Sequence, residues 1–247
     1  MRGGLIFGPV DETAVLADLR GRAVNYDPAD SPAAGDPQPG RRWHVDSAAV
    51  LIGQEPPGDP VPGGVWEATC ALTSRYEFAD AGILRAVYLA GSDLDGREML
   101  MEGRFLGLRF YFGVRVTRVF DETRATGRGP ERVWGWCYDT LQGHLEQGRI
   151  NFEVIKNLRT GQVAFRVAGY ARAARLPSPL VRLGFRLFGR WLAQRYYQAD
   201  RRRLYDLVQA GSSPPPPSRP DGLVTAPATA QNSWWDRFAP GWLHPGS

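Results

Sequence analysis

The feature that most restricts the fold is a series of strand-like stretches between residues 43 and 171. Apolar and polar residues alternate in several of them, which is the pattern of half-buried strands. The breaks SDLDG, DETRATGRG and NLRTG have the composition of hairpin turns. Closely spaced sequential strands predict a curved antiparallel sheet, a meander of about seven strands. The predicted strands are 43–52, 64–75, 83–90, 98–110, 112–120, 132–140, 149–156 and 162–171.

One long helix is predicted after these strands, over residues 179–209. Pro179 suits its first turn, and Arg182, Arg186 and Arg190 fall on one side. The other side is a broad apolar arc, which suits packing across the concave face of the sheet. Alternatively, a basic amphipathic helix can lie on an anionic membrane surface. The arc comprises Leu180, Val181, Phe185, Phe188, Trp191, Leu192 and Tyr196.

The two ends of the chain differ from its centre. Residues 10–20 predict a short helix that Asp11 can cap. We interpret 1–210 as one α+β domain with its core at 43–209, and 211–247 as a proline-rich linker and disordered tail. The aromatic residues at 234–243 also suit a docking motif for a partner, a membrane or the protein's own groove.

Composition excludes several classes of protein. The chain has 247 residues, a net charge of +4 and 43% hydrophobic residues. Its basic residues are scattered, so we expect no nucleic-acid binding. We expect Cys70 and Cys137 to be free thiols rather than part of a disulfide or a zinc site. The N-terminal apolar stretch is short and broken, so we do not expect it to act as a signal peptide. We therefore expect a cytoplasmic protein. The sequence has no phosphate-binding loop, no hydrolase motif and no cluster of residues with metal-ligand spacing, so neither a cofactor nor a metal is predicted.

The stretch WGWCYDTLQGHLEQG carries the candidate chemistry. Trp134, Trp136 and Tyr138 alternate and predict one apolar face of a strand. His144 and Glu146 follow the turn at Gly143, two residues apart and therefore on one side of an extended chain.

The register of the next strands decides where that pair points. Phe152 and Phe165 belong to the inward faces of their predicted strands. If the strand runs back through Gly148 without a bulge, His144 and Glu146 also face inward. Because glycine is a common site of bulges, the opposite direction stays open.

Three roles suit Thr140, His144 and Glu146. They can satisfy backbone groups at the turn, with Glu146 paired to an arginine. They can anchor a polar group of a ligand. A carboxylate can also orient an imidazole that moves a proton near neutral pH, which would make His144 and Glu146 catalytic residues.

The same stretch resembles the signature of the DUF1990 (UPF0548) family, roughly GxxYGTLxGHxExGEExF. Asp139 replaces a glycine of that pattern, and Arg149 and Ile150 replace its acidic pair. The resemblance implies a helix-grip architecture like that of Bet v 1 and START domains (the SRPBCC class), and it implies no reaction. The matching positions are Gly135, Tyr138, Thr140, Leu141, Gly143, His144, Glu146, Gly148 and Phe152.

These observations predict a cavity between the sheet and the C-terminal helix that binds a hydrophobic small molecule or lipid. The alternatives are an enzyme of the isomerase or cyclase type that uses His144 and Glu146, and an interaction module that docks through its aromatic tail. The predicted ligand-binding residues are Tyr138, Thr140, Trp134, Trp136, Phe152 and Phe165.

Overall fold

The computed structural model describes residues 4–7, 10–32, 43–105, 108–174, 202–211, 215–230 and 240–243. Most of this part of the chain is strand. The helical elements are α1 (Glu12–Leu19), η1 (Pro28–Asp30), α2 (Val65–Ser74) and residues 202–209. The strands are β1 (Gly4–Phe7), β2 (His44–Gln54), β3 (Leu84–Leu89), β4 (Glu98–Phe105), β5 (Leu108–Thr126), β6 (Gly129–Thr140), β7 (Glu146–Asn157), β8 (Gln162–Ala173), β9 (Leu223–Ala226) and β10 (Pro240–Leu243).

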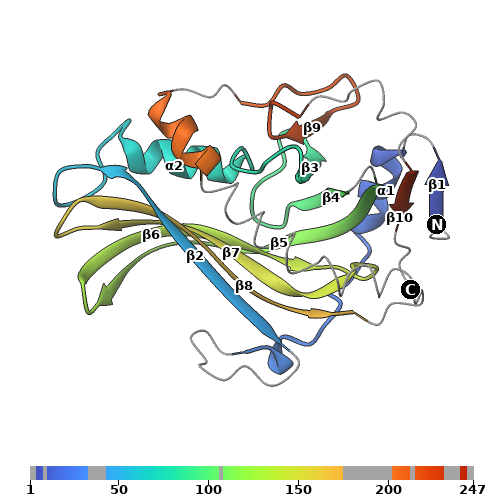
Figure 1. Ribbon diagram of the computed structural model, residues 1–247, viewed down its shortest axis with the longest axis horizontal. Helices are drawn as coiled ribbons and strands as arrows, with labels where there is room; N and C mark the ends of the chain where they lie inside the picture. The colour runs from blue at the N-terminus through green and yellow to red at the C-terminus, as the bar shows by residue number, and fades with distance from the viewer. Residues whose placement is uncertain are drawn as a thin grey trace.

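Within the described ranges, ten strands form one sheet. Eight follow the order β2-β8-β7-β6-β5-β4-β3-β9, and each pairs antiparallel with its neighbours. β10 pairs antiparallel with β1 and parallel with β5. Figure 1 shows the long strands β2 and β5–β8 curving beneath α2 and the helical residues 202–209. The predicted α+β class and curved antiparallel sheet are confirmed.

Glycines permit the close strand contacts of this curved sheet. A Cβ atom on Gly148 would collide with the backbone carbonyl oxygen of Tyr170, and one on Gly169 would lie 2.6 Å from that of Arg149. Only glycine allows backbones to approach so closely. The pairing of β7 with β8 runs through Gly148 without a change of register, so this residue is not a bulge.

The two faces of the sheet carry separate apolar cores. On the concave face, a cluster that includes Trp136, Phe152 and Phe165 packs with residues of α2 and of the turn that follows it. On the other face, α1 buries Val15, Leu16 and Leu19 against β3, β4 and β5. The predicted helix at 10–20 is therefore confirmed. Asp11 caps it by accepting the N–H of Ala14 at 3.0 Å.

The strand predicted at 64–75 is wrong, because this segment is helix α2. Its buried residues are Trp66, Thr69, Leu72 and Thr73, a spacing that fits about 3.6 residues per turn rather than two. The N-terminus of α2 is also held from outside, since the carboxylate of Glu55 accepts the N–H of Trp66 at 2.8 Å.

The bounds of two further strands also differ from those predicted. The break predicted near residue 111 lies earlier, since β4 ends at Phe105 and β5 begins at Leu108. β5 then runs on to Thr126, so most of DETRATGRG is strand rather than turn.

The helix predicted over 179–209 is seen only at its end, because residues 179–201 lie outside the described ranges. Residues 202–209 are helical, with Leu204 fully buried. A single long C-terminal helix is not confirmed.

The interpretation of 211–247 as a disordered tail is wrong where the structure describes that segment. β9 pairs with β3, and Leu223 and Ala226 are fully buried. β10 joins β1 and β5. The one-domain division at residue 210 stays a prediction.

Candidate functional site

An aromatic layer lies on the concave face of the sheet, where several of the predicted ligand-binding residues meet. Trp136, Phe152 and Phe165 are fully buried, and the exposed fraction of Tyr138 is 4%. The rings of Trp136 and Phe152 lie 4.6 Å apart between centroids, and those of Tyr138 and Phe152 lie 5.7 Å apart. Trp134 packs against the same cluster and is partly buried. The predicted inward rows are thus brought together, but their binding role stays a prediction.

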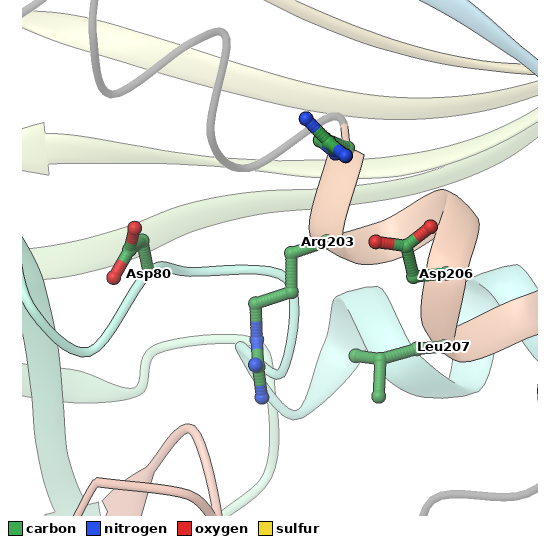
Figure 2. Close-up of a pocket in the computed structure, with 5 residues that line it drawn as sticks. Asp80, Arg203, Asp206 and Leu207 are labelled. Carbon is green, nitrogen blue, oxygen red and sulfur yellow. The ribbon is translucent and has the colours of Figure 1, made fainter.

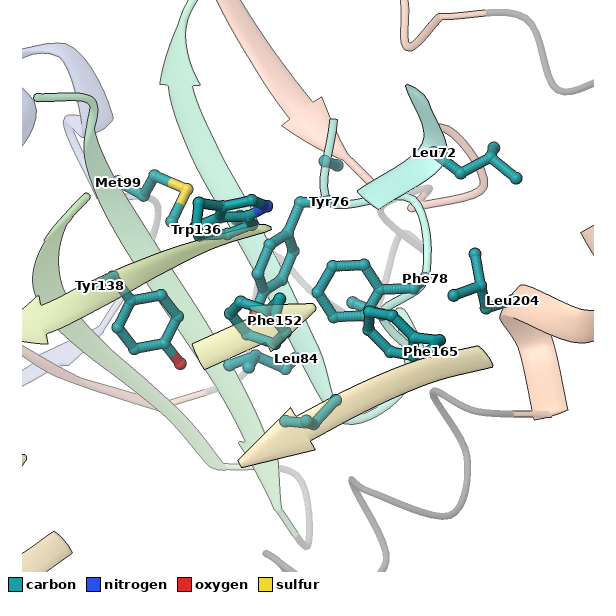
Figure 3. Packing of buried hydrophobic residues seen from close by; sticks show 14 of the residues in the cluster. Leu72, Tyr76, Phe78, Leu84, Met99, Trp136, Tyr138, Phe152, Phe165 and Leu204 are labelled. Carbon is teal, nitrogen blue, oxygen red and sulfur yellow. The ribbon is translucent and has the colours of Figure 1, made fainter. Parts of the chain in front are cut away.

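Two further rings, Tyr76 and Phe78, cover this layer from the segment after α2 (Figure 3). The centroid of Phe78 lies 4.9 Å from that of Phe152 and 5.4 Å from that of Phe165. Tyr76 lies 6.0 Å from Phe152 and 6.2 Å from Trp136. Neither residue was predicted from the sequence, although the pattern Y-E-F at 76–78 places two aromatics on one side of an extended chain.

The backbone of Tyr76 is strained. Its φ of 62° lies in the left-handed region, which costs a residue with a Cβ atom about 1–2 kcal/mol. The cause is the end of α2, where the N–H of Glu77 donates to Leu72 O and that of Tyr76 to Thr73 O. This is a Schellman motif, in which glycine is the usual residue at the position of Tyr76. Burial of the ring, 1% exposed, offsets the strain.

A polar atom inside the layer has no partner among the described residues. The indole Nε1 of Trp136 is buried and makes no hydrogen bond. An unpaired buried donor costs about 1–3 kcal/mol. The indole Nε1 of Trp66 and the hydroxyl of Thr73, both on α2, are in the same condition.

His144 lies in the turn between β6 and β7 and is 8% exposed. Its ring atom Nδ1 accepts the backbone N–H of Glu146 at 2.9 Å. The backbone N–H of His144 donates to Leu141 O at 3.0 Å. Its ring packs edge-on against Phe112, with 4.4 Å between centroids. Because Nδ1 accepts, a neutral imidazole carries its proton on Nε2.

Thr140 closes the same turn from β6. Its hydroxyl accepts the N–H of Gly148 at 2.9 Å and donates to the side-chain oxygen of Asn25 at 2.7 Å. The residue therefore satisfies polar groups of the turn, as one of the predicted roles required.

Glu146 is the first residue of β7 and shares the inward face with Phe152, because the pairing of β7 with β8 has no register shift. No salt bridge joins its partly buried carboxylate to the residues described here. Burial, followed by the negative charge of Asp46, raises the pKa of Glu146 to about 7. The carboxyl group is therefore held near its ionisation point at neutral pH.

This raised pKa predicts a pH dependence of stability. A carboxyl whose pKa is higher in the folded state stabilises the protein below its unfolded pKa, and that stability is lost as the pH rises through about 7. Relative to Glu146→Gln, the wild type should lose on the order of 1–2 kcal/mol of unfolding free energy between about pH 5 and about pH 8. Urea titrations measure this. Asp95→Asn, at an exposed carboxyl, is the control, and equal slopes for wild type and Glu146→Gln would contradict the assignment.

On the outer face, two of the residues that depart from the pattern noted in the sequence contact each other. Asp139 and Arg149 are directly opposite in β6 and β7. The guanidinium of Arg149 donates to both carboxylate oxygens of Asp139, at 3.0 and 2.8 Å. The hydroxyls of Tyr26 and Thr117 also donate to this buried carboxylate. This group therefore holds the segment around Tyr26 on the sheet.

A buried ion pair lies near the other end of β7 and was also missed from sequence. Lys156, the only lysine of the chain, is fully buried, and its Nζ donates to Glu55 Oε2 and to Asp59 O, both at 2.7 Å. Burial raises the pKa of Glu55, but hydrogen bonds from Lys156, Trp66 and Val61 lower it below its ordinary value overall. The sequence did hold a signal for this pair. Lys156 is four residues after Phe152 on the same strand, so the alternation of strand side chains places both on the inward face.

A pocket of about 460 Å³ opens elsewhere, beside the helical residues 202–209 (Figure 2). It is lined by Asp80, Arg202, Arg203, Asp206 and Leu207. Arg203 is engaged there, since it donates to Glu77 O and to the Thr229 hydroxyl, both at 2.9 Å. None of the predicted site residues lines this pocket.

The described residues contain no group of three His, Cys, Asp or Glu side chains arranged to hold a metal ion. Cys70 and Cys137 are free thiols there, as predicted. No helix among them is long and apolar enough to cross a membrane.

The fold and site define an α+β protein with one large antiparallel sheet, whose concave face is lined by aromatic rings and ends at a partly buried carboxyl group. The profile of the family described as "Domain of unknown function (DUF1990)" matches residues 26–199. Because this is more than half of the chain, the protein belongs to the DUF1990 family. A comparison with curated protein sequences finds no match.

Several solved structures are similar to the chain at low identity. Ara h 8.0201 is 12% identical with a TM-score of 0.37, and the match covers 68% of this chain and 99% of that one. A Thalictrum norcoclaurine synthase point mutant, in complex with a transition-state analogue, is 9% identical with a TM-score of 0.41 and coverages of 69% and 97%. Human STARD10 is 9% identical with a TM-score of 0.37 and coverages of 90% and 96%.

Proposed function

We propose that the concave face of the sheet binds a hydrophobic small molecule or lipid. The observation that carries this proposal is a change in side-chain size along the inward face. Aromatic rings fill it from Phe165 to Tyr138, whereas most inward positions of β7 and β8 beyond Ile150 are occupied by very small residues. These small inward residues are Gly148, Gly169, Ala171 and Ala173.

A curved sheet cannot fill its own concavity where its inward side chains are this small. This stretch of small residues borders the aromatic layer on one side and Thr140, His144 and Glu146 on the other. A site with apolar walls and few polar groups is the usual form of a small-molecule pocket. The apolar part of the ligand would contact Tyr138 and Ile150, and Thr140 and Glu146 would border the site at its other end.

A bulky side chain in place of one of these small residues should exclude the ligand. Ala171 lies opposite Gly148 on the inward face, so Ala171→Phe places a ring in the proposed site. Native mass spectrometry of the full chain purified from cells should show a bound small molecule on the wild type and its loss, at least about tenfold, from Ala171→Phe.

The matched control is Ala164→Phe on the same strand, because Ala164 lies opposite Leu51 on the outer face. It should retain the ligand. A wild type that carries no small molecule, or an Ala171→Phe variant that carries as much as Ala164→Phe, would rule out this site.

Acid–base catalysis remains the second candidate, and one observation favours it. A carboxyl group with a pKa of about 7 can both donate and accept a proton at neutral pH. In that case Glu146 would be the catalytic group. His144 would be a positioning residue, since its Nδ1 already accepts the backbone N–H of Glu146.

A further inference from the structure

Three buried polar atoms of α2 and β6 have no partner among the described residues, and each has a proton to donate. Trp136 Nε1 and Trp66 Nε1 are donors that cannot accept, and the Thr73 hydroxyl also has a proton to donate. Trp136 and Thr73 are fully buried, and Trp66 is 9% exposed. The two indoles therefore lack an acceptor among the residues that the structure describes.

Trp136 is the donor that lies within the proposed ligand-binding face. It belongs to the inward row of β6, opposite Phe152 and two residues before Tyr138. In Figure 3 the nitrogen edge of its indole faces Tyr76, whose ring centroid lies 6.2 Å away. An acceptor that reached this edge would enter where the ring of Tyr76 now lies.

Tyr76 is also the residue with strained backbone, since its φ is 62°. Strain of this kind is concentrated at sites that bind or switch. An unpaired donor and a strained residue thus face each other in one apolar layer. Each is unfavourable by itself, and a ligand that displaced the Tyr76 ring and accepted from Trp136 would relieve the first directly.

We propose that the ligand of the concave face carries a neutral carbonyl oxygen, as in a ketone, ester or amide, and that this oxygen accepts a hydrogen bond from Trp136 Nε1. The oxygen is neutral because the surrounding cluster is apolar and a buried anion needs a cation beside it. This inference rests on the proposed binding function and specifies its ligand class.

The indole N–H resonances of the ¹⁵N-labelled full chain test this directly. The probes are methyl nonyl ketone and undecane, which have the same chain length and differ in one oxygen. The ketone should bind about tenfold more tightly and move the Trp136 resonance downfield, whereas undecane should leave it in place. Trp43 is the internal control, because its Nε1 already donates to Asp30 O at 2.8 Å on the outer face.

Trp136→Phe assigns the resonance and should bind both probes with equal affinity. Equal affinities in the wild type with an unmoved Trp136 resonance would overturn the acceptor site and leave the binding function intact. A buried water already bonded to Trp136 would give that same result. A tenfold preference that persisted in Trp136→Phe would also overturn it, and failure of both probes to bind the wild type would overturn the binding function itself.

Discussion

Replacing Lys156 by Met should lower the unfolding free energy by about 3–5 kcal/mol. The change leaves the carboxylate of Glu55 buried, 6% exposed, without its cation. An uncompensated buried charge is among the most destabilising of single defects. The same carboxylate holds the N-terminus of α2 through the N–H of Trp66, so the loss should also loosen that helix. Urea unfolding at neutral pH measures the effect.

The large loss of unfolding free energy is expected only for a buried ion pair. Arg132→Met breaks the Arg132–Asp121 pair, whose side chains are 32% and 47% exposed, and should cost less than about 1 kcal/mol. The double variant Glu55→Gln/Lys156→Met removes both charges and should recover part of the loss. A cost for Lys156→Met as small as that for Arg132→Met would show that the buried pair does not hold this part of the fold.

Elements governed by local patterns were predictable from the sequence. Helix α1 has a capping Asp11 and three apolar residues at helical spacing, and all of these are as expected. The central strands and their inward residues also followed from alternation, because period two fixes which side chains share a face. Continuous pairing through Gly148 then placed Glu146 on the inward side, the direction expected if no bulge was present.

Features that depend on distant contacts were not predictable in the same way. The segment of α2 is rich in Val, Thr and Trp, which favour strands, yet its buried positions follow a helical period and its N-terminus is fixed by Glu55. The ion pair between Asp139 and Arg149 could be found only with the register of β6 against β7. Tyr76 occupies a position where glycine is usual, so no sequence rule would place its ring inside the layer.

The segment beyond residue 211 was misjudged because its proline-rich composition hides a short strand. Leu223, Val224 and Ala226 are buried, and they pair with β3 in the same sheet as the site. The N–H of Ala228 also donates to both carboxylate oxygens of Glu77, at 3.0 Å each. Burial raises the pKa of Glu77, and the hydrogen bond from this N–H acts in the opposite direction by stabilising the buried carboxylate. Residues 223–228 are therefore part of the same sheet and its packing.

Deleting residues 212–247 should accordingly destabilise the protein by on the order of 5 kcal/mol, because it uncovers the edge of β3 and removes the partner of Glu77. A disordered tail would instead change the unfolding free energy by less than about 0.5 kcal/mol. Leu223→Ala isolates the packing contribution and should cost about 2–5 kcal/mol, since Leu223 is fully buried. Pro217→Ala, at an exposed position of the same segment, is the control and should change little. If Leu223→Ala proved as stable as Pro217→Ala, β9 would contribute nothing to the sheet.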